Sequence, residues 1–207
     1  AAGSDVLKLG LIGCGGRGTG AAGNAMTADK NTKLVAMGDA FGDRLQSSLA
    51  NLKRQYSDRI AVDKDHCFVG FDAYKKVLAS DVDVVILGET PHFRPIHLKA
   101  AIEAGKHVFC EKPVAVDAPG VRSVLATSEL ATKKGLCIVS GLCWRYHHGT
   151  KAAMQRVLDG AIGDILVMQE TYNTGAIGGR ERKPEMSEME FQMRNWYCFT
   201  WLSGDHN

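Results

Sequence analysis

Short apolar runs alternate along the chain with segments whose apolar residues recur at helical spacing. The runs have the length of buried strands and cover residues 6–12, 33–39, 67–69, 82–87, 106–110 and 136–140. The segments between them predict helices over residues 19–28, 44–56, 72–78 and 119–134 and a further helix that ends at residue 104. This alternation predicts an α/β fold, a doubly wound parallel sheet with helices on both faces and right-handed crossovers.

The pattern changes after residue 146, so we divide the chain into a first domain (1–146) and a second domain (147–207). Thr150–Leu158 has the spacing of an amphipathic helix, and Asp164–Tyr172 alternates apolar and polar residues as a strand does. A single strand is not stable without neighbours. We therefore expect the second domain to be the N-terminal part of a larger α+β unit, with partner strands beyond the given sequence.

A Gly- and charge-rich loop is predicted over residues 173–189, followed by an aromatic segment at 193–202. Trp196, Tyr197 and Trp201 contribute to its aromatic content. The segment predicts one helix whose large apolar surface another part of the protein must cover. Stacking of these rings on a sugar is the alternative to a role in packing.

The first predicted strand ends in the motif Gly13-x-Gly15-x-x-Gly18, and a helix follows at once. Gly13 allows a sharp reversal, Gly15 leaves room for a pyrophosphate against the backbone, and Gly18 lets helix and sheet approach closely. The helix N-terminus then offers free N–H groups to phosphates. Gly16 and Arg17 complete this candidate phosphate loop, with Arg17 either beside the pyrophosphate or on the surface.

Asp39 ends the next predicted strand, about 20 residues past the last glycine, where dinucleotide-binding folds place an acidic residue. Its carboxylate can accept hydrogen bonds from the adenosine ribose hydroxyls and would repel a 2′-phosphate, which favours NAD over NADP. Arg44 could instead meet a 2′-phosphate. Asp39 as a simple helix cap is the other interpretation.

Ligands of such sheets bind beyond the carboxyl ends of the strands. Five segments follow predicted strands and should therefore lie along one edge of the sheet and form one site. They are Gly13–Gly18, Asp39, Gly88–His92, Glu111–Pro113 and Gly141–His147.

Composition narrows the function classes. A formal net charge of +2, with basic and acidic residues interspersed, gives no electrostatic case for nucleic acid, and no apolar run approaches a membrane span. The six cysteines form no C-x-x-C pair and no cluster with histidine, so we predict no metal site. Most of them are expected to be small buried hydrophobes, although Cys14 could be reactive because a helix N-terminus lowers a thiol pKa.

Three stretches together resemble the Gfo/Idh/MocA oxidoreductases: Gly13-Cys-Gly-Gly-Arg-Gly18, the run from Ala100 to Glu111-Lys112-Pro113, and Gly141-Leu-Cys-Trp-Arg-Tyr146. The resemblance covers residues 6 to about 146. It implies a Rossmann domain followed by a domain with a large, open, mostly antiparallel sheet. It also implies NAD or NADP as cofactor and hydride transfer to or from a sugar, cyclitol or related polyol.

By position, the resemblance places Glu111 near the nicotinamide ribose and Lys112 beside the reacting carbon, as a base or as an electrostatic anchor for an alkoxide. Arg145 falls in the loop that returns to the active site. Thr90 and Pro91 fall in the nicotinamide-side loop. There the chain departs from the family, since Glu89-Thr90 stands where many members have Thr-Pro, and Arg94 where they often have His.

The family usually supplies a carboxylate and a histidine as D-x-x-x-H in its second domain. Asp205 is the candidate carboxylate, and the matching histidine would lie beyond the given residues. His206 is a candidate substrate contact at a different spacing.

Two other function classes stay open beside the oxidoreductase: a glycoside hydrolase that uses NAD for transient oxidation and elimination, and a non-catalytic dinucleotide-binding fragment or sensor. The resemblance implies a carbohydrate-like small molecule as substrate and a homo-oligomer formed through the C-terminal sheet. Similar relatives often carry twin-arginine export signals. A periplasmic location after removal of a leader is therefore expected, with the cytoplasm as the alternative.

Overall fold

A single parallel sheet organises the part of the chain that the computed structural model describes, residues 6–175 and 177–205. Its strand order is β3-β2-β1-β4-β5-β6, and every neighbouring pair is parallel. The strands are β1 (Leu7–Ile12), β2 (Thr32–Asp39), β3 (Cys67–Val69), β4 (Val84–Leu87), β5 (His107–Cys110) and β6 (Ile138–Ser140). The predicted Rossmann-type doubly wound sheet is confirmed.

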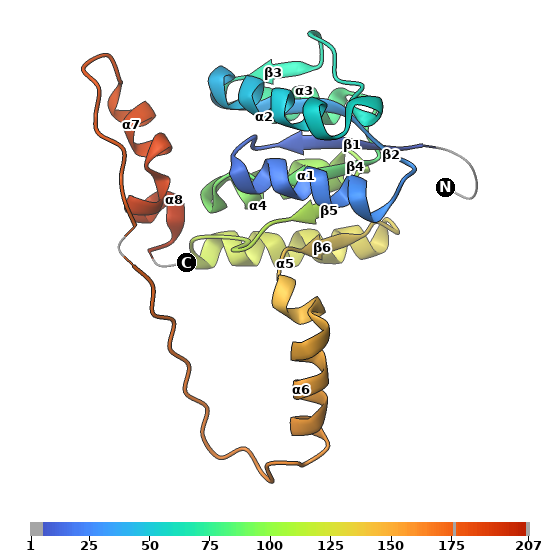
Figure 1. Cartoon of the computed structure of the whole chain (residues 1–207), viewed down its shortest axis with the longest axis vertical. Helices are drawn as coiled ribbons and strands as arrows, with labels where there is room; N and C mark the ends of the chain where they lie inside the picture. The colour runs from blue at the N-terminus through green and yellow to red at the C-terminus, as the bar shows by residue number, and fades with distance from the viewer. Residues whose placement is uncertain (1–5, 176, 206–207) are drawn as a thin grey trace.

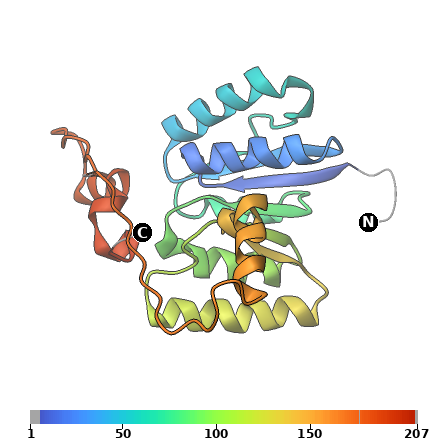
Figure 2. The same cartoon turned by 60° about the horizontal axis from the view of Figure 1, so that its bottom comes forward.

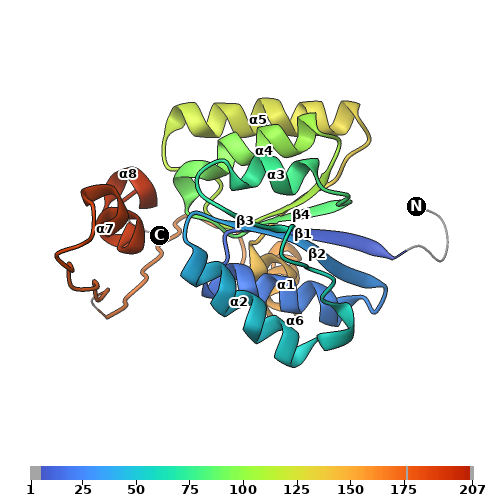
Figure 3. The same cartoon turned by 90° about the horizontal axis from the view of Figure 1, so that it is seen from above.

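Helices cover both faces of the sheet. Figure 3 shows α1 (Gly16–Ala28) and α2 (Gly42–Gln55) on one face, and α3 (Ala73–Ala79), α4 (Arg94–Glu103) and α5 (Ala118–Lys133) on the other. The apolar stripe predicted for α2 is buried as Leu45, Leu49 and Leu52 against β2 and α1. The strand order reverses at β1, which pairs with β2 on one side and β4 on the other, so the carboxyl ends of these strands meet at one edge.

The chain leaves the sheet after β6. The short helix η3 (Cys143–Tyr146) leads into α6 (His148–Leu158), which confirms the predicted helix. This helix extends away from the sheet in Figure 1 and lies in front of it in Figure 2. Within the described residues, no helix has both the length and the apolarity needed to cross a membrane.

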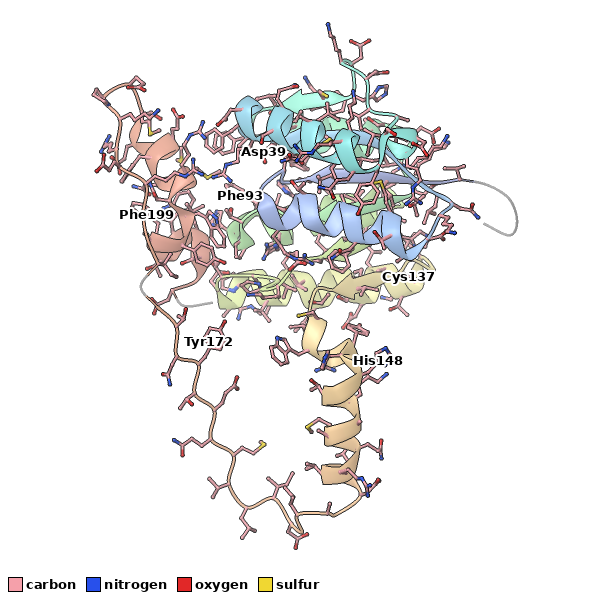
Figure 4. All side chains as sticks on the ribbon, viewed as in Figure 1. Asp39, Phe93, Cys137, His148, Tyr172 and Phe199 are labelled. Carbon is pink, nitrogen blue, oxygen red and sulfur yellow. The ribbon has the colours of Figure 1, made fainter. Side chains whose placement is uncertain are left out.

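The strand predicted over residues 164–172 is wrong for this structure. The segment is extended and unpaired, with Leu166 89% exposed, and Figure 4 shows Tyr172 on this isolated stretch. A strand needs a neighbour for its backbone hydrogen bonds, and no described segment lies beside it. The antiparallel sheet expected for the second domain is therefore not formed by the described residues.

The aromatic segment is also not the single helix that we predicted. It folds as α7 (Glu188–Arg194), η4 (Trp196–Cys198) and α8 (Thr200–Ser203). Asn195 interrupts it, because its side chain donates to the Phe191 carbonyl (3.0 Å) and accepts from the Arg180 N–H (2.5 Å). We call residues 188–203 the docked segment. It packs at the carboxyl edge of the sheet, where the Trp201 ring meets His92 edge to face at 5.1 Å.

The six cysteines differ in burial, and Cys67 is partly buried. Cys14 and Cys110 are buried, whereas the expectation of burial is wrong for Cys137, Cys143 and Cys198, which are exposed around the last strand, η3 and the docked segment. Burial, followed by the charge of Asp39, raises the pKa of the Cys14 thiol well above its ordinary value. The helix N-terminus therefore does not make Cys14 a reactive thiolate.

We expect iodoacetamide at neutral pH to alkylate Cys137, Cys143 and Cys198 at least about tenfold faster than Cys14 and Cys110, because only accessible thiols form reactive thiolates. Burial also raises the pKa of Cys110, to about 12. Peptide mass mapping over time measures the order of modification. Early labelling of Cys14 in folded protein would contradict the burial of this thiol.

Candidate active site

A cleft of about 760 Å³ lies between the carboxyl edge of the sheet and the docked segment. Figure 4 shows Asp39 and Phe93 at this edge, facing the part of the chain that carries Phe199. The sheet side contributes predicted site residues to the walls, namely Gly13, Gly15, Arg17, Asp39, Arg44, Thr90, Glu111 and Lys112. The docked segment contributes Met193, Trp196 and Tyr197. The volume suits a ligand of cofactor size.

The glycine loop has the geometry that its sequence predicts. Gly13 has φ +88°, in the left-handed region, and a Cβ there would lie 2.2 Å from the Glu89 nitrogen. A Cβ on Gly18 would lie 1.9 Å from the Gly13 carbonyl oxygen, so this glycine permits the close approach of α1 to the sheet. Gly15 differs, because its added Cβ would meet only an Arg44 nitrogen at 3.7 Å and would otherwise point into open space.

The N-terminus of α1 is open to an anion. Gly15 is the cap residue and makes no side-chain cap bond, and the first turn of α1 holds no acidic residue. The N–H groups of the first turn and the helix dipole therefore favour an anion at this end of α1. This chemistry fits a pyrophosphate.

Asp39 connects the glycine loop to the turn before α2. Its carboxylate accepts from the Cys14 N–H (2.6 Å) and the Phe41 N–H (2.8 Å). Burial raises the pKa of this carboxyl above its ordinary value, while those two hydrogen bonds and the charge of Arg44 act in the opposite direction. Because a carboxylate oxygen can accept more than one hydrogen bond, Asp39 retains capacity for ribose hydroxyls.

Glu111 ties the phosphate loop to the turn after β5. Its buried carboxylate binds the guanidinium of Arg17, 94 residues away in sequence, with Oε1 2.7 Å from Nε and 2.6 Å from Nη2. Its Oε2 accepts from the Lys112 backbone N–H at 3.2 Å. A Cβ on Gly141 would lie 2.7 Å from Oε1, so that glycine leaves room for the carboxylate. Lys112 itself is exposed at the cleft.

Sequence reasoning missed a polar cluster behind the loop after β4. Arg94 is 4% exposed and donates to the carbonyls of Pro113 and Glu89, both at 2.5 Å. The carboxylate of Glu89 lies 3.1 Å from Nδ1 of His97, and both side chains are 10% exposed. The available signal was an acidic residue two positions past the buried strand β4, where many members of the similar family have threonine.

The docked segment is held at the beginning of α2 by Arg194. Its guanidinium nitrogens lie 3.0 and 3.1 Å from the Asp43 carboxylate and 2.9 Å from Glu190. Its Cζ lies 4.1 Å from the centroid of the Phe41 ring. The hydrogen bonds from Arg194 lower the pKa of the Asp43 carboxyl. One arginine therefore connects α7 to the beginning of α2.

Replacing Arg194 with alanine should loosen the docked segment without unfolding the sheet. The lost ion pair and cation–π contact are worth about 1 kcal/mol at a partly exposed site, which corresponds to about fivefold faster amide exchange in residues 188–203. The control is Arg182→Ala, since Arg182 pairs with Glu188 and lies over the Phe191 ring, and both of these partners belong to the docked segment itself. Equal exchange in both variants would argue against this latch.

Several predicted site residues are not brought into the cleft wall. Arg145 is exposed on η3, and Asp205 is exposed with φ +82° after α8. Pro91 is buried beneath the wall, and Gly16 lines a separate hollow between α1 and α2. His206 lies outside the described residues. The roles assigned to these residues, and to those lining the cleft, remain predictions.

A family model described as "Oxidoreductase family, NAD-binding Rossmann fold" matches residues 7–141. This description confirms the predicted nicotinamide-dinucleotide class of cofactor.

Similar curated proteins include an inositol 2-dehydrogenase of Klebsiella pneumoniae, 27% identical over 83% of this chain and 47% of that protein. Inositol 2-dehydrogenase 4 of Saccharopolyspora erythraea is 32% identical over 78% of this chain and 44% of its own length. Among solved structures, apo scyllo-inositol dehydrogenase from Lactobacillus casei has a TM-score of 0.61 at 25% identity, covering 77% of this chain and 43% of that one. The chain thus spans about half the length of the relatives it matches.

Proposed function

Because the chain belongs to the Gfo/Idh/MocA oxidoreductase family, we propose that its protein transfers hydride between a nicotinamide dinucleotide and a cyclitol, sugar or related polyol. One observation carries the proposal. The phosphate loop, the acidic residue after β2 and the Glu111-Lys112 turn line a single cleft. The matched inositol dehydrogenases support a cyclitol as the first substrate class to test.

Different residues of the cleft would bind different parts of the cofactor. The α1 N-terminus and Gly15 would hold the pyrophosphate, and Asp39 the adenosine ribose. The half-buried Asp39 carboxylate favours NAD over NADP, since a 2′-phosphate would meet its charge. When bound, the cofactor supplies the hydride acceptor or donor.

Lys112 is the group best placed to act on the substrate hydroxyl. It follows Glu111, which is fixed by Arg17, and its side chain is exposed at the cleft. An ammonium group can orient a hydroxyl and stabilise the negative charge that develops on oxygen as hydride leaves, and the neutral amine can take the proton. The positioned Lys112 therefore supports alcohol oxidation and, in reverse, carbonyl reduction.

The test begins with binding. Titration with NAD⁺, NADH, NADP⁺ and NADPH, followed through the three tryptophans, should show saturation with the NAD forms at the lower concentration. Incubation of the protein with NAD⁺ and inositol isomers or simple sugars should then form NADH. Absence of binding by all four dinucleotides would overturn the proposal. Glycoside cleavage without net NADH formation would assign the protein to the hydrolase class instead.

A further inference from the structure

We infer that Glu89 contacts the nicotinamide end of the dinucleotide and binds the oxidised, positively charged ring in preference to the reduced, neutral ring. The inference rests on the proposed function, because it needs a nicotinamide dinucleotide in the cleft. Glu89 is a specificity residue for redox state in this assignment, not a proton-transfer group.

The position of Glu89 in the fold places it on the side of the cleft where the nicotinamide half of a dinucleotide would lie. Glu89 lies two residues past the end of β4 and against the phosphate loop, since a Cβ on Gly13 would come within 2.2 Å of its nitrogen. Asp39 ends β2, on the opposite side of β1. A dinucleotide that crosses the switch point with its adenosine at β2 places its other half over β4 and β5. Glu89 and Lys112 both line the cleft on that side.

The carboxylate is held in place and has one oxygen available. Its Oε1 lies 3.1 Å from Nδ1 of His97, whose ring stacks on Tyr74 at 4.1 Å and on Phe93 at 6.0 Å. Its Oε2 is buried and has no hydrogen-bond partner among the described residues. A buried acceptor without a partner is costly, so a ligand group in the cleft would relieve that cost.

Neighbouring polar atoms mark the same place as a ligand contact. Oγ1 of Thr90 and Nε of Arg94 are also buried without partners within the described chain, and both residues line the cleft. The other nitrogens of Arg94 donate to the carbonyls of Pro113 and Glu89, not to the Glu89 carboxylate. Three unpartnered atoms between the end of β4 and the first residue of α4 point to a polar ligand end.

Charge decides which form of the ligand this loop prefers. Of the two carboxylates on the nicotinamide side of the cleft, Glu111 is paired directly with Arg17. Glu89 bonds to an imidazole through one oxygen and is near the charge of Arg94, whose guanidinium donates to backbone carbonyls and forms no ion pair with it. The oxidised and reduced rings differ by one positive charge and little in shape. A carboxylate in a partly buried cleft therefore favours the oxidised ring.

The experiment compares Glu89→Gln with the wild-type protein in calorimetric titrations with NAD⁺, NADH and ADP-ribose. Glutamine keeps the shape and can still bond to His97 but removes the charge. The Kd for NAD⁺ should rise about tenfold, while the Kd for NADH and ADP-ribose should change by less than about twofold. Glu103→Gln, which removes an exposed carboxylate paired with Lys99 on α4, is the matched control and should leave all three unchanged.

Equal weakening of NAD⁺ and NADH would overturn the inference, and so would weakened ADP-ribose binding, which would indicate a structural role. If the variant does not fold, the inference is tested by measuring the affinity of the wild-type protein for benzamide adenine dinucleotide, whose ring is neutral. That analogue should bind about tenfold more weakly than NAD⁺, and equal affinity refutes the charge preference. A wild-type protein that binds no dinucleotide overturns the proposed function itself, a result distinct from either outcome.

Discussion

Replacement of Lys112 by alanine is expected to lower kcat/KM for oxidation of the polyol substrate by about 10²–10⁴-fold. This is the usual contribution of a positioned acid–base or electrostatic group. The Kd for NAD⁺ should change by less than about threefold, because the phosphate loop and Asp39 are untouched. Steady-state formation of NADH and a parallel binding titration measure the two effects separately.

Lys112→Arg distinguishes the two roles of the lysine. Arginine keeps the positive charge but does not give up its proton at neutral pH, so it rescues part of the activity only if Lys112 acts as an electrostatic anchor. Full loss in both variants indicates a base. Near-normal turnover of Lys112→Ala on a true substrate would remove this residue from the mechanism.

Replacement of Gly15 by alanine should weaken NAD⁺ binding by at least about a hundredfold, or about 3 kcal/mol, while the fold stays intact. Its φ of −70° suits alanine, and the added methyl group would meet only Arg44 at 3.7 Å. That methyl group would occupy the space where a pyrophosphate must touch the backbone. Calorimetry and a thermal melt read out affinity and stability on the same sample.

Two neighbouring glycines provide the controls. Gly16→Ala adds a Cβ with nothing within 4 Å and should leave both affinity and stability nearly unchanged. Gly18→Ala drives a Cβ to 1.9 Å from the Gly13 carbonyl and should cost more than about 3 kcal/mol of folding free energy. Unaltered NAD⁺ affinity in Gly15→Ala would show that the loop does not hold the phosphates.

The sequence-based prediction was most successful where the signal is local. The alternating apolar runs predicted all six described strands, with boundaries within a few residues, because burial on a parallel sheet demands such runs. Where partners were missing, it failed. Residues 164–172 have the alternation of a strand but no neighbour, and Asn195 breaks the aromatic helix through its own side-chain bonds.

The sequence by itself determined the sheet, the glycine loop and the acidic residue after β2, since periodicity and backbone freedom are properties of a few consecutive residues. Only the tertiary structure decided that Arg17 pairs with Glu111, that His97 holds Glu89, and that Arg194 reaches Asp43. Those contacts join residues from different elements. They depend on the direction of each side chain and on which helices pack together, and the spacing of residues along the sequence specifies neither.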